Sequence, residues 1–422
     1  MSVGLSLHGT VPRIPGAEPQ PDLHRVQRWM RAHCGETLVS AREAEDSERR
    51  AALYVLLHPA AEEVEFVRTA PGTLSVSANT STAGPGYHIY LCDLLERLGA
   101  DLDVSWHPPE GQTGDETGYF DRHEPAKVYE AMLAWFQTIA SILAADLSAE
   151  DGQLIVCMPS SHHFDDRWRV VSALGPLEPE WIEQVAEEPQ LGQDFFPWWN
   201  RGQDADYSIR RALSLMWKEV RWRPPLSDSE ARAMEDSAVM LERAYTLDRA
   251  REYPWREWKE LVEHGGFATP LRDKIMARAA DVDPTTPLIG YRRYDVRVDL
   301  TGGWSIRIPG AFAESWEDER TWYAWDATRT VRFSCVSITN EDGTPQTAEE
   351  ILGAYVDIQE TFDHEEEGVI GRAYLAHSLD EHWNLHGRTA VSGSLAVCTI
   401  TIGSPDDKDW ALETWRSLRY GR

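Results

Sequence analysis

The first 190 residues alternate between stretches with a strand pattern and stretches with a helix pattern. GLSLHG and TLSVSANT alternate between apolar and polar positions, which is typical of a strand with one buried face. In DLHRVQRWMRAH, and again from Tyr87 onward, apolar residues recur every three or four positions, as in an amphipathic helix. Because strands and helices follow one another in this way, the pattern predicts a mixed three-layer α/β domain over residues 1–190.

Two apolar runs in this region predict a buried helix and a central strand. The run AMLAWFQTIASILAA, residues 131–145, is shorter than the roughly 20 residues that a membrane-spanning helix needs. It therefore predicts a buried helix and no membrane span. The run LIVCM, residues 154–158, is apolar at consecutive positions, which is typical of a central strand covered on both faces.

Residues 191–282 have a helical pattern and predict either a helical subdomain or a cap over the α/β layer. Three helices are expected, within DADYSIRRALSLMWKEV, SDSEARAMEDSAVMLERAYTLDRA and PWREWKELVEHGG. Ser227 and Glu230 have the spacing of a capping box at the start of the second helix. The prolines and glycine of DVDPTTPLIG then predict a linker over residues 283–290.

An aromatic cluster, FFPWWN, comes early in the helical segment. Its large side chains are Phe195, Phe196, Trp198 and Trp199. One interpretation is a hydrophobic plug that joins the helices to the preceding sheet. The other is an exposed aromatic hot spot that binds a protein partner.

Residues 291–422 change to a strand-rich pattern. YDVRVDL, WSIRIPG, WYAWDA and TVRFSCVSIT predict strands, and DKDWALETWRSLR predicts a closing helix. A further helix is expected after Thr347, which forms a capping box with Glu350. The pattern predicts a separate α+β domain.

The order of these elements resembles that of the PsbP-like α/β/α sandwich. The resemblance is carried by WSIRIPG, by VSITNEDGTPQTAEEIL, and by AVCTITIG followed by WALETWRSLR. It covers residues 291–422 only, and implies a domain with an antiparallel sheet that binds or assembles with other proteins rather than an enzyme. The whole chain is therefore expected to be an α/β and α+β multidomain protein.

The charge of the chain narrows the range of partners. Seventy acidic and 41 basic residues give a net charge of −29. Such a chain repels nucleic acids and anionic membranes, and it attracts a basic protein. We therefore expect a basic protein partner, with no direct binding to nucleic acid or membrane. Self-association through the 18 tryptophans is an alternative.

The five cysteines are odd in number, widely spaced and set among apolar residues. This usage is typical of reduced cysteines, and no C-x-x-C pair indicates a zinc site. The amino terminus has neither a basic segment nor a long apolar segment of the kind that a secretory signal contains. A cytoplasmic location is expected, with no cofactor and no metal.

Residues 81–88, STAGPGYH, join a predicted strand to a predicted helix. A glycine loop that enters a helix exposes backbone N–H groups that bind anions, so Gly84, Gly86 and His88 are candidate ligand-binding residues. The stretch matches no nucleotide-binding fingerprint. A compact connection, in which the glycines adopt positive φ, is the competing interpretation.

The stretch PSSHHFDDRW contains a dense polar cluster after the strand at LIVCM. His162, His163, Asp165 and Asp166 offer nitrogen and oxygen donors for a metal, or a histidine and carboxylate for proton transfer. Neighbouring side chains on an extended chain point in opposite directions, so at most one of each pair would share a site. A polar surface loop is the alternative.

Two functions follow from these observations. The first is a soluble acidic protein-binding module, such as an immunity-type inhibitor or an accessory subunit of a bacterial toxin, defence or secretion system, which occludes a basic partner. The second is an enzyme whose small-molecule or metal-dependent hydrolytic pocket lies between the Gly84–His88 loop and the His162–Asp166 loop. The lack of any strong catalytic motif favours the first.

Overall fold

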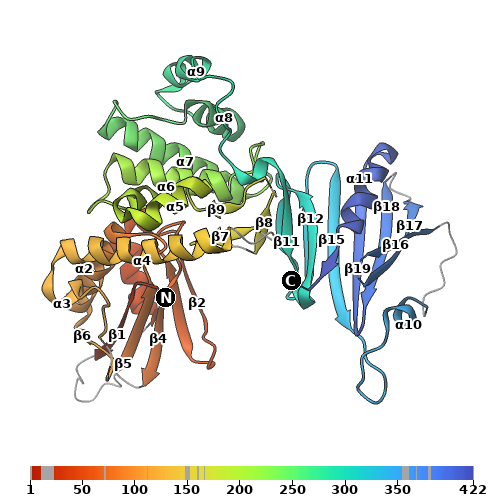
Figure 1. Ribbon diagram of the computed structural model, residues 1–422, viewed down its shortest axis with the longest axis horizontal. Coiled ribbons are helices and arrows are strands. Elements are labelled where there is room, and N and C mark those ends of the chain that lie inside the picture. Colours follow the sequence, from red (N-terminus) through yellow and green to blue (C-terminus); the bar gives the residue numbers. More distant parts are fainter. Residues whose placement is uncertain are drawn as a thin grey trace. The chain divides into compact units, whose positions relative to one another are not determined.

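The computed structural model describes residues 2–10, 23–70, 73–111, 113–147, 153–158, 161–165, 167–353, 361–366, 368–378 and 382–421 (Figure 1). The chain forms two compact units, and each contains helices and antiparallel sheets. The first unit comprises Met1–Pro159, Arg167–Glu219 and Ala233–Ile289, and the second comprises Ser160–Asp166, Val220–Arg232 and Gly290–Arg422. This architecture confirms a mixed α/β multidomain protein. Most of the predicted helical segment belongs to the first unit.

The first unit is built on a six-stranded antiparallel sheet with the order β2-β3-β4-β5-β1-β6. Its strands are β1 (Gly4–Thr10), β2 (Ser40–Glu45), β3 (Ala51–Leu56), β4 (Val64–Ala70), β5 (Thr73–Asn79) and β6 (Ser105–His107). In β1, Leu5 and Leu7 are buried, whereas Ser6 and His8 lie on the opposite face. The sheet therefore has one apolar face and one polar face.

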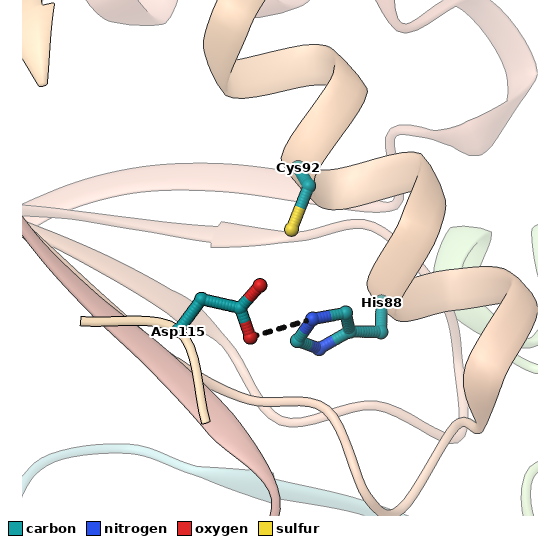
Figure 2. Close-up of side chains that lie close together, drawn as sticks. All are labelled: His88, Cys92 and Asp115. Atoms are coloured by element: carbon teal, nitrogen blue, oxygen red, sulfur yellow. Dashed lines mark ion pairs between the residues drawn. The ribbon is translucent and has the colours of Figure 1, made fainter. Parts of the chain in front are cut away.

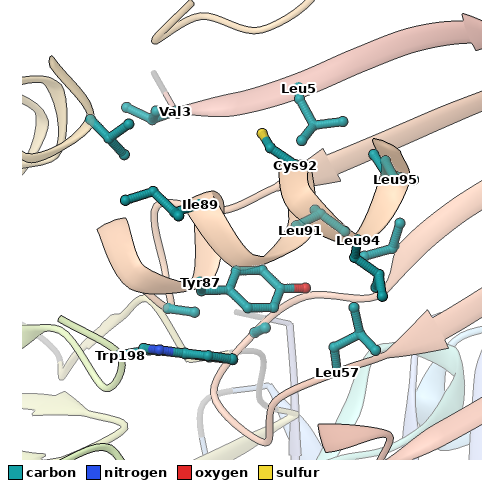
Figure 3. Packing of buried hydrophobic residues seen from close by; sticks show 14 of the residues in the cluster. Val3, Leu5, Leu57, Tyr87, Ile89, Leu91, Cys92, Leu94, Leu95 and Trp198 are labelled. Atoms are coloured by element: carbon teal, nitrogen blue, oxygen red, sulfur yellow. The ribbon is translucent and has the colours of Figure 1, made fainter. Parts of the chain in front are cut away.

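The apolar face packs against helices, of which the central one is α2 (Pro85–Leu102). Figure 3 shows how apolar side chains on several sides of α2 contact the sheet and the neighbouring loops. The other helices of this region are α1 (Leu23–His33), α3 (Tyr119–Arg122) and α4 (Pro125–Asp146). By length and composition α4 is apolar enough to cross a membrane, but one face of it, including Met132 and Phe136, is buried in the core.

The strand expected at LIVCM differs from the prediction. It is β7 (Leu154–Val156), and it lies at the edge of a three-stranded sheet with β9 (Val170–Ser172) and β10 (Gly175–Pro176). Its single neighbour is β9, which runs parallel to it. The apolar run was misleading because Leu154 and Ile155 are only half-buried.

The predicted helices of the following segment are present. They are α6 (Ala205–Lys218), α7 (Asp228–Leu247) and α8 (Trp255–Gly265), with the additional helices α5 (Pro179–Glu187) and α9 (Arg272–Ala280). Ser227 accepts a hydrogen bond from the backbone N–H of Glu230, at 3.3 Å. The Glu230 carboxylate pairs with Arg223 and accepts the backbone N–H of Leu226, one residue before Ser227, so the capping box is displaced by one residue.

The second unit contains a seven-stranded antiparallel sheet with the order β13-β14-β15-β19-β18-β17-β16. Its strands are β13 (Ala313–Trp316), β14 (Thr321–Trp325), β15 (Arg329–Ser337), β16 (Thr361–Glu366), β17 (Val369–His377), β18 (Trp383–Val391) and β19 (Ser394–Ile402). The helix α11 (Lys408–Arg416) packs on it (Figure 1). Trp415 of this helix lies over Gly371 and Gly387. The glycines leave room that a Cβ atom would fill.

The other elements of this unit are a four-stranded sheet and a short helix. The strands are β8 (His162–Phe164), β11 (Asp295–Asp299), β12 (Trp304–Pro309) and β20 (Arg419–Tyr420). The helix α10 (Ala348–Gly353) begins at the predicted capping box, which is complete: Thr347 and Glu350 each bond the backbone N–H of the other.

Candidate functional site

The densest buried polar cluster of the first unit surrounds His88 (Figure 2). His88 and Cys92 lie one turn apart on α2, and Asp115 approaches them from the loop that precedes α3. All three side chains are buried, and their donor atoms lie within 4.8 Å of one another. The cluster combines a nitrogen, a sulfur and an oxygen donor in one buried space.

Hydrogen bonds fix the orientation of the His88 ring. Its Nδ1 lies 2.8 Å from Thr80 Oγ1, which donates to the carbonyl of Val3 at 3.0 Å. Because the threonine has given its proton to that carbonyl, Nδ1 is the donor toward Thr80. The other nitrogen, Nε2, lies 3.1 Å from Asp115 Oδ1 and 3.0 Å from Thr117 Oγ1.

Asp115 is held by the loop that carries it. It accepts the backbone N–H groups of Thr117 and Phe120, each at 2.8 Å. Burial alone would raise the pKa of Asp115, but His88 and these amides hold it well below its usual range. Burial, with the carboxylate of Asp115 as a smaller cause, raises the pKa of the Cys92 thiol well above its usual value.

The glycines that precede His88 are packed against protein, which corrects the ligand-cradle interpretation. The backbone N–H of Gly86 donates to the carbonyl of Trp198 at 3.0 Å, so this donor at the start of α2 is already used. A Cβ atom at Gly84, whose φ is 109°, would lie 2.7 Å from Cβ of Phe196. The glycines therefore serve a compact connection that receives the aromatic loop.

The aromatic loop itself is buried, which corrects the exposed hot-spot interpretation. Phe195, Phe196 and Trp198 are at most 4% exposed, and Trp199 is half-buried. The Trp198 ring contacts Tyr87 at the start of α2, at a centroid distance of 5.9 Å (Figure 3). The cluster is the hydrophobic plug of the first unit, because its side chains face the core.

A second candidate site is a groove of about 520 Å³ on the polar face of the six-stranded sheet. Its floor is one cross-strand row of Tyr54, Glu65, Ser77 and Ser6, from β3, β4, β5 and β1. Glu65 accepts hydrogen bonds from Tyr54 at 2.9 Å and from Ser77 at 3.4 Å. The floor is polar and carries one negative charge.

Three more glutamates line the groove: Glu62, Glu63 and Glu116. Glu63 pairs with Arg42 at 2.6 Å. Glu62 accepts from the side-chain amide of Asn79, and Glu116 accepts from the backbone N–H of Gly4. The partners of Glu62, Glu65 and Glu116 are neutral, unlike the partner of Glu63. These three glutamates therefore have no salt-bridge partner among the described residues.

The two predicted histidines of the HHFDD stretch belong to the second unit. They lie in β8, which pairs with β11 through Phe164 and Val296. His162 bonds Glu314 at 2.9 Å, and the side chain of His163 lies 3.7 Å from Asp299. The strand geometry sends neighbouring histidines to different partners, in agreement with the expectation that they would not share a site.

Glu314 is the centre of a buried ionic network in the second unit. Its carboxylate contacts Arg292 at 2.9 Å and Arg221 at 3.3 Å, in addition to His162. Burial alone would raise the pKa of Glu314, but Arg292 and His162 hold it well below its usual range. Burial, and then the charge of Arg292, lower the pKa of His162.

The HHFDD stretch also contains the two predicted aspartates. Asp165 is half-buried next to β8, and Asp166 lies outside the described residues. The Gly84–His88 loop and the His162–Asp166 loop belong to different compact units. A shared enzyme pocket therefore stays a prediction without support from the geometry of either unit.

Sequence reasoning missed the residues that complete both candidate sites. Asp115 lies in the turn-rich stretch GDETG, 27 residues after His88, with no motif to join the two. The sequence indicates the groove glutamates more clearly than Asp115, because Glu62 and Glu63 precede a strand in which Glu65 has a polar position. A second group of potential metal ligands, Asp93, Glu96 and His123, lies on the more exposed side of α2 and α3.

Comparisons with known proteins gave matches to solved structures alone. No family model and no curated protein matches the chain. The solution structure of cyanobacterial PsbP from Synechocystis sp. PCC 6803 matches with 12% identity over 33% of this chain and 97% of that chain, at a TM-score of 0.23. A crystal structure from Bacteroides thetaiotaomicron VPI-5482 matches with 11% identity over 28% of this chain and 46% of that chain, at a TM-score of 0.22. At these TM-scores neither likeness bears on function.

Proposed function

We propose that this protein is a binding module whose acidic groove accepts a basic segment of a protein partner. The observation that carries the proposal is the groove of about 520 Å³, in which three glutamates surround a polar floor that contains a fourth, Glu65. Three of them, Glu62, Glu65 and Glu116, make their hydrogen bonds with neutral groups. A lysine or arginine side chain of a partner supplies both the missing charge and the hydrogen-bond donors.

The charge of the chain supports the same function at longer range. A net charge of −29 accelerates encounter with a basic partner, and the effect weakens as salt is raised. The groove then provides a defined place for the partner, with a floor on the sheet and walls from the loops that precede β4 and α3. Occlusion of a basic toxin or nuclease, as an immunity-type inhibitor or as an accessory subunit, is the biological form that we propose for this binding.

The test compares two variants with the same change in charge. In the first, Glu62, Glu65 and Glu116 are replaced by glutamine; in the second, Glu180, Glu183 and Glu187, which are exposed on α5, are replaced in the same way. Wild type and both variants are used to purify partners from the host at low salt, and bound proteins are quantified by mass spectrometry. A basic protein that the groove variant loses at least tenfold, and that the α5 variant retains, supports the proposal.

Two outcomes contradict the groove as the binding site. Equal loss in both variants would show that net charge alone attracts the partner. Equal retention in both would place the contact on another surface. For a partner that passes the test, the dissociation constant is then measured at about 50 and 200 mM salt, and weaker binding at the higher salt is expected.

A further inference from the structure

We propose that His88, Cys92 and Asp115 form a closed structural zinc site, which fastens the loop of residues 113–118 to α2 (Figure 2). The donor side chains are buried and do not line the groove, although the same loop carries Glu116, which does. Imidazole, thiolate and carboxylate are the ligands that zinc accepts, whereas calcium and magnesium prefer oxygen ligands alone. The chemistry of the donors therefore points to zinc.

The positions of the donors suit a small tetrahedral ion. Zinc bonds of about 2.0–2.3 Å separate neighbouring ligand atoms by roughly 3.3–3.8 Å. His88 Nε2 and Asp115 Oδ1 already lie 3.1 Å apart, and the Cys92 sulfur points into the same space (Figure 2). Since all the donors lie within 4.8 Å of one another, side-chain shifts of about 1 Å bring them to zinc distances. Thr117 Oγ1, 3.0 Å from Nε2, offers a neutral oxygen as the fourth donor, while its own proton remains directed to Asp115 Oδ1 at 2.9 Å.

The groups around the donors are arranged as in a metal site. A metal-binding histidine donates its second ring N–H to a fixed acceptor, which leaves the other nitrogen for the ion. His88 Nδ1 does so toward Thr80, and Thr80 is itself fixed by the Val3 carbonyl. The second oxygen of Asp115 is held by the backbone N–H of Phe120 at 2.8 Å. The histidine and the carboxylate thus keep their orientation when the ion binds.

The charges of this site balance. A zinc ion bound by one thiolate, one carboxylate and one neutral imidazole has a net charge of zero, which avoids the cost of an unpaired buried charge. Zinc binding releases to solvent the thiol proton of Cys92 and the proton through which His88 Nε2 bonds Asp115, so that the lone pair of Nε2 is available to the ion. Because all the ligands are buried, the ion enters as the chain folds, and it stabilises the folded state.

The experiment measures zinc in the full-length chain. The protein is unfolded, refolded with a small excess of zinc chloride, freed of loose metal on a desalting column, and analysed by elemental mass spectrometry. Wild type is expected to hold one zinc per chain, and Cys92→Ala to bind it at least tenfold more weakly. Cobalt in place of zinc should give a thiolate-to-metal charge-transfer band in wild type that Cys92→Ala lacks.

Two matched variants separate this site from others. Cys34→Ala removes another buried cysteine of the same core, and Glu96→Gln alters the more exposed group of potential ligands. Both should retain the zinc and the cobalt band. The proposal is overturned if refolded wild type, with a native circular dichroism spectrum, holds less than about one zinc per ten chains. It is equally overturned if Cys92→Ala keeps the metal while Glu96→Gln loses it.

Discussion

Each unit buries a histidine against a carboxylate, but the two pairs have different surroundings. His88 and Asp115 are surrounded by threonine hydroxyls and backbone amides, which are neutral. His162 and Glu314 share their space with two arginines. Neutral dipoles satisfy the polar atoms of the first pair, and charged groups satisfy those of the second. Substitution of the second pair should therefore cost more stability, because loss of its carboxylate leaves cations buried together.

The largest loss of stability is expected from removal of the Glu314 carboxylate. Glu314→Ala should destabilise the second unit by about 3–5 kcal/mol, because the two arginines and His162 lose their common anion in a buried space. The free energy of unfolding is measured by urea denaturation followed by tryptophan fluorescence. Glu317→Ala is the control, because Glu317 forms an exposed pair with Arg332 and its loss should cost less than about 1 kcal/mol. Equal effects of the two substitutions would remove the distinction between the pairs.

A smaller effect is expected in the first unit. Asp115→Asn should cost about 2–3 kcal/mol when measured with a chelator present, because the amide replaces an anion that accepts several hydrogen bonds. No arginine is left unpaired there, so the loss should stay below that of Glu314→Ala. Asp121→Asn, at an exposed position of α3, is the matched control and should change little. A loss for Asp115→Asn as large as that for Glu314→Ala would show that neutral surroundings offer no protection.

The stability of the second unit should also depend on pH. The pKa of Glu314 is lowered in the folded state, so its contribution is present above the unfolded pKa of about 4.3 and is lost as pH falls. The pKa of His162 is also lowered, so its protonation below about 6.5 favours unfolding. The second unit should therefore lose stability steadily from pH 7 to pH 4 in urea denaturation. His162→Gln should flatten the curve between pH 6.5 and 5; an unchanged curve would exclude the histidine as its cause.

The sequence predicted the parts of these sites that depend on local pattern. Alternation located β1 and β5, and three-to-four spacing located α2, which carries His88. Local pattern does not indicate which distant residue meets such an element. Glu314 is 152 residues from His162, and only the pairing of β8 with the sheet of the second unit joins them. The same limit explains the error at LIVCM, because apolar residues at the edge of a small sheet look like those of a central strand.

The smallest changes in stability are expected at two buried threonines, Thr80 and Thr82. Thr80 donates to the Val3 carbonyl and accepts from His88, whereas Thr82 Oγ1 has no hydrogen-bond partner within the described part of the chain. Thr80→Val should cost about 1–2 kcal/mol, because His88 loses its acceptor in a buried space. Thr82→Val removes an unsatisfied hydroxyl and should be neutral or slightly stabilising.

Both threonine variants keep the side-chain shape, so the difference between their unfolding free energies reports the hydrogen bonds alone. Equal losses would mean that Thr82 binds a water molecule that replaces the missing partner. Equal retention of stability would mean that His88 has found another acceptor, and that its ring is not fixed by Thr80. In that case either ring nitrogen of His88 would be free to face the carboxylate of Asp115.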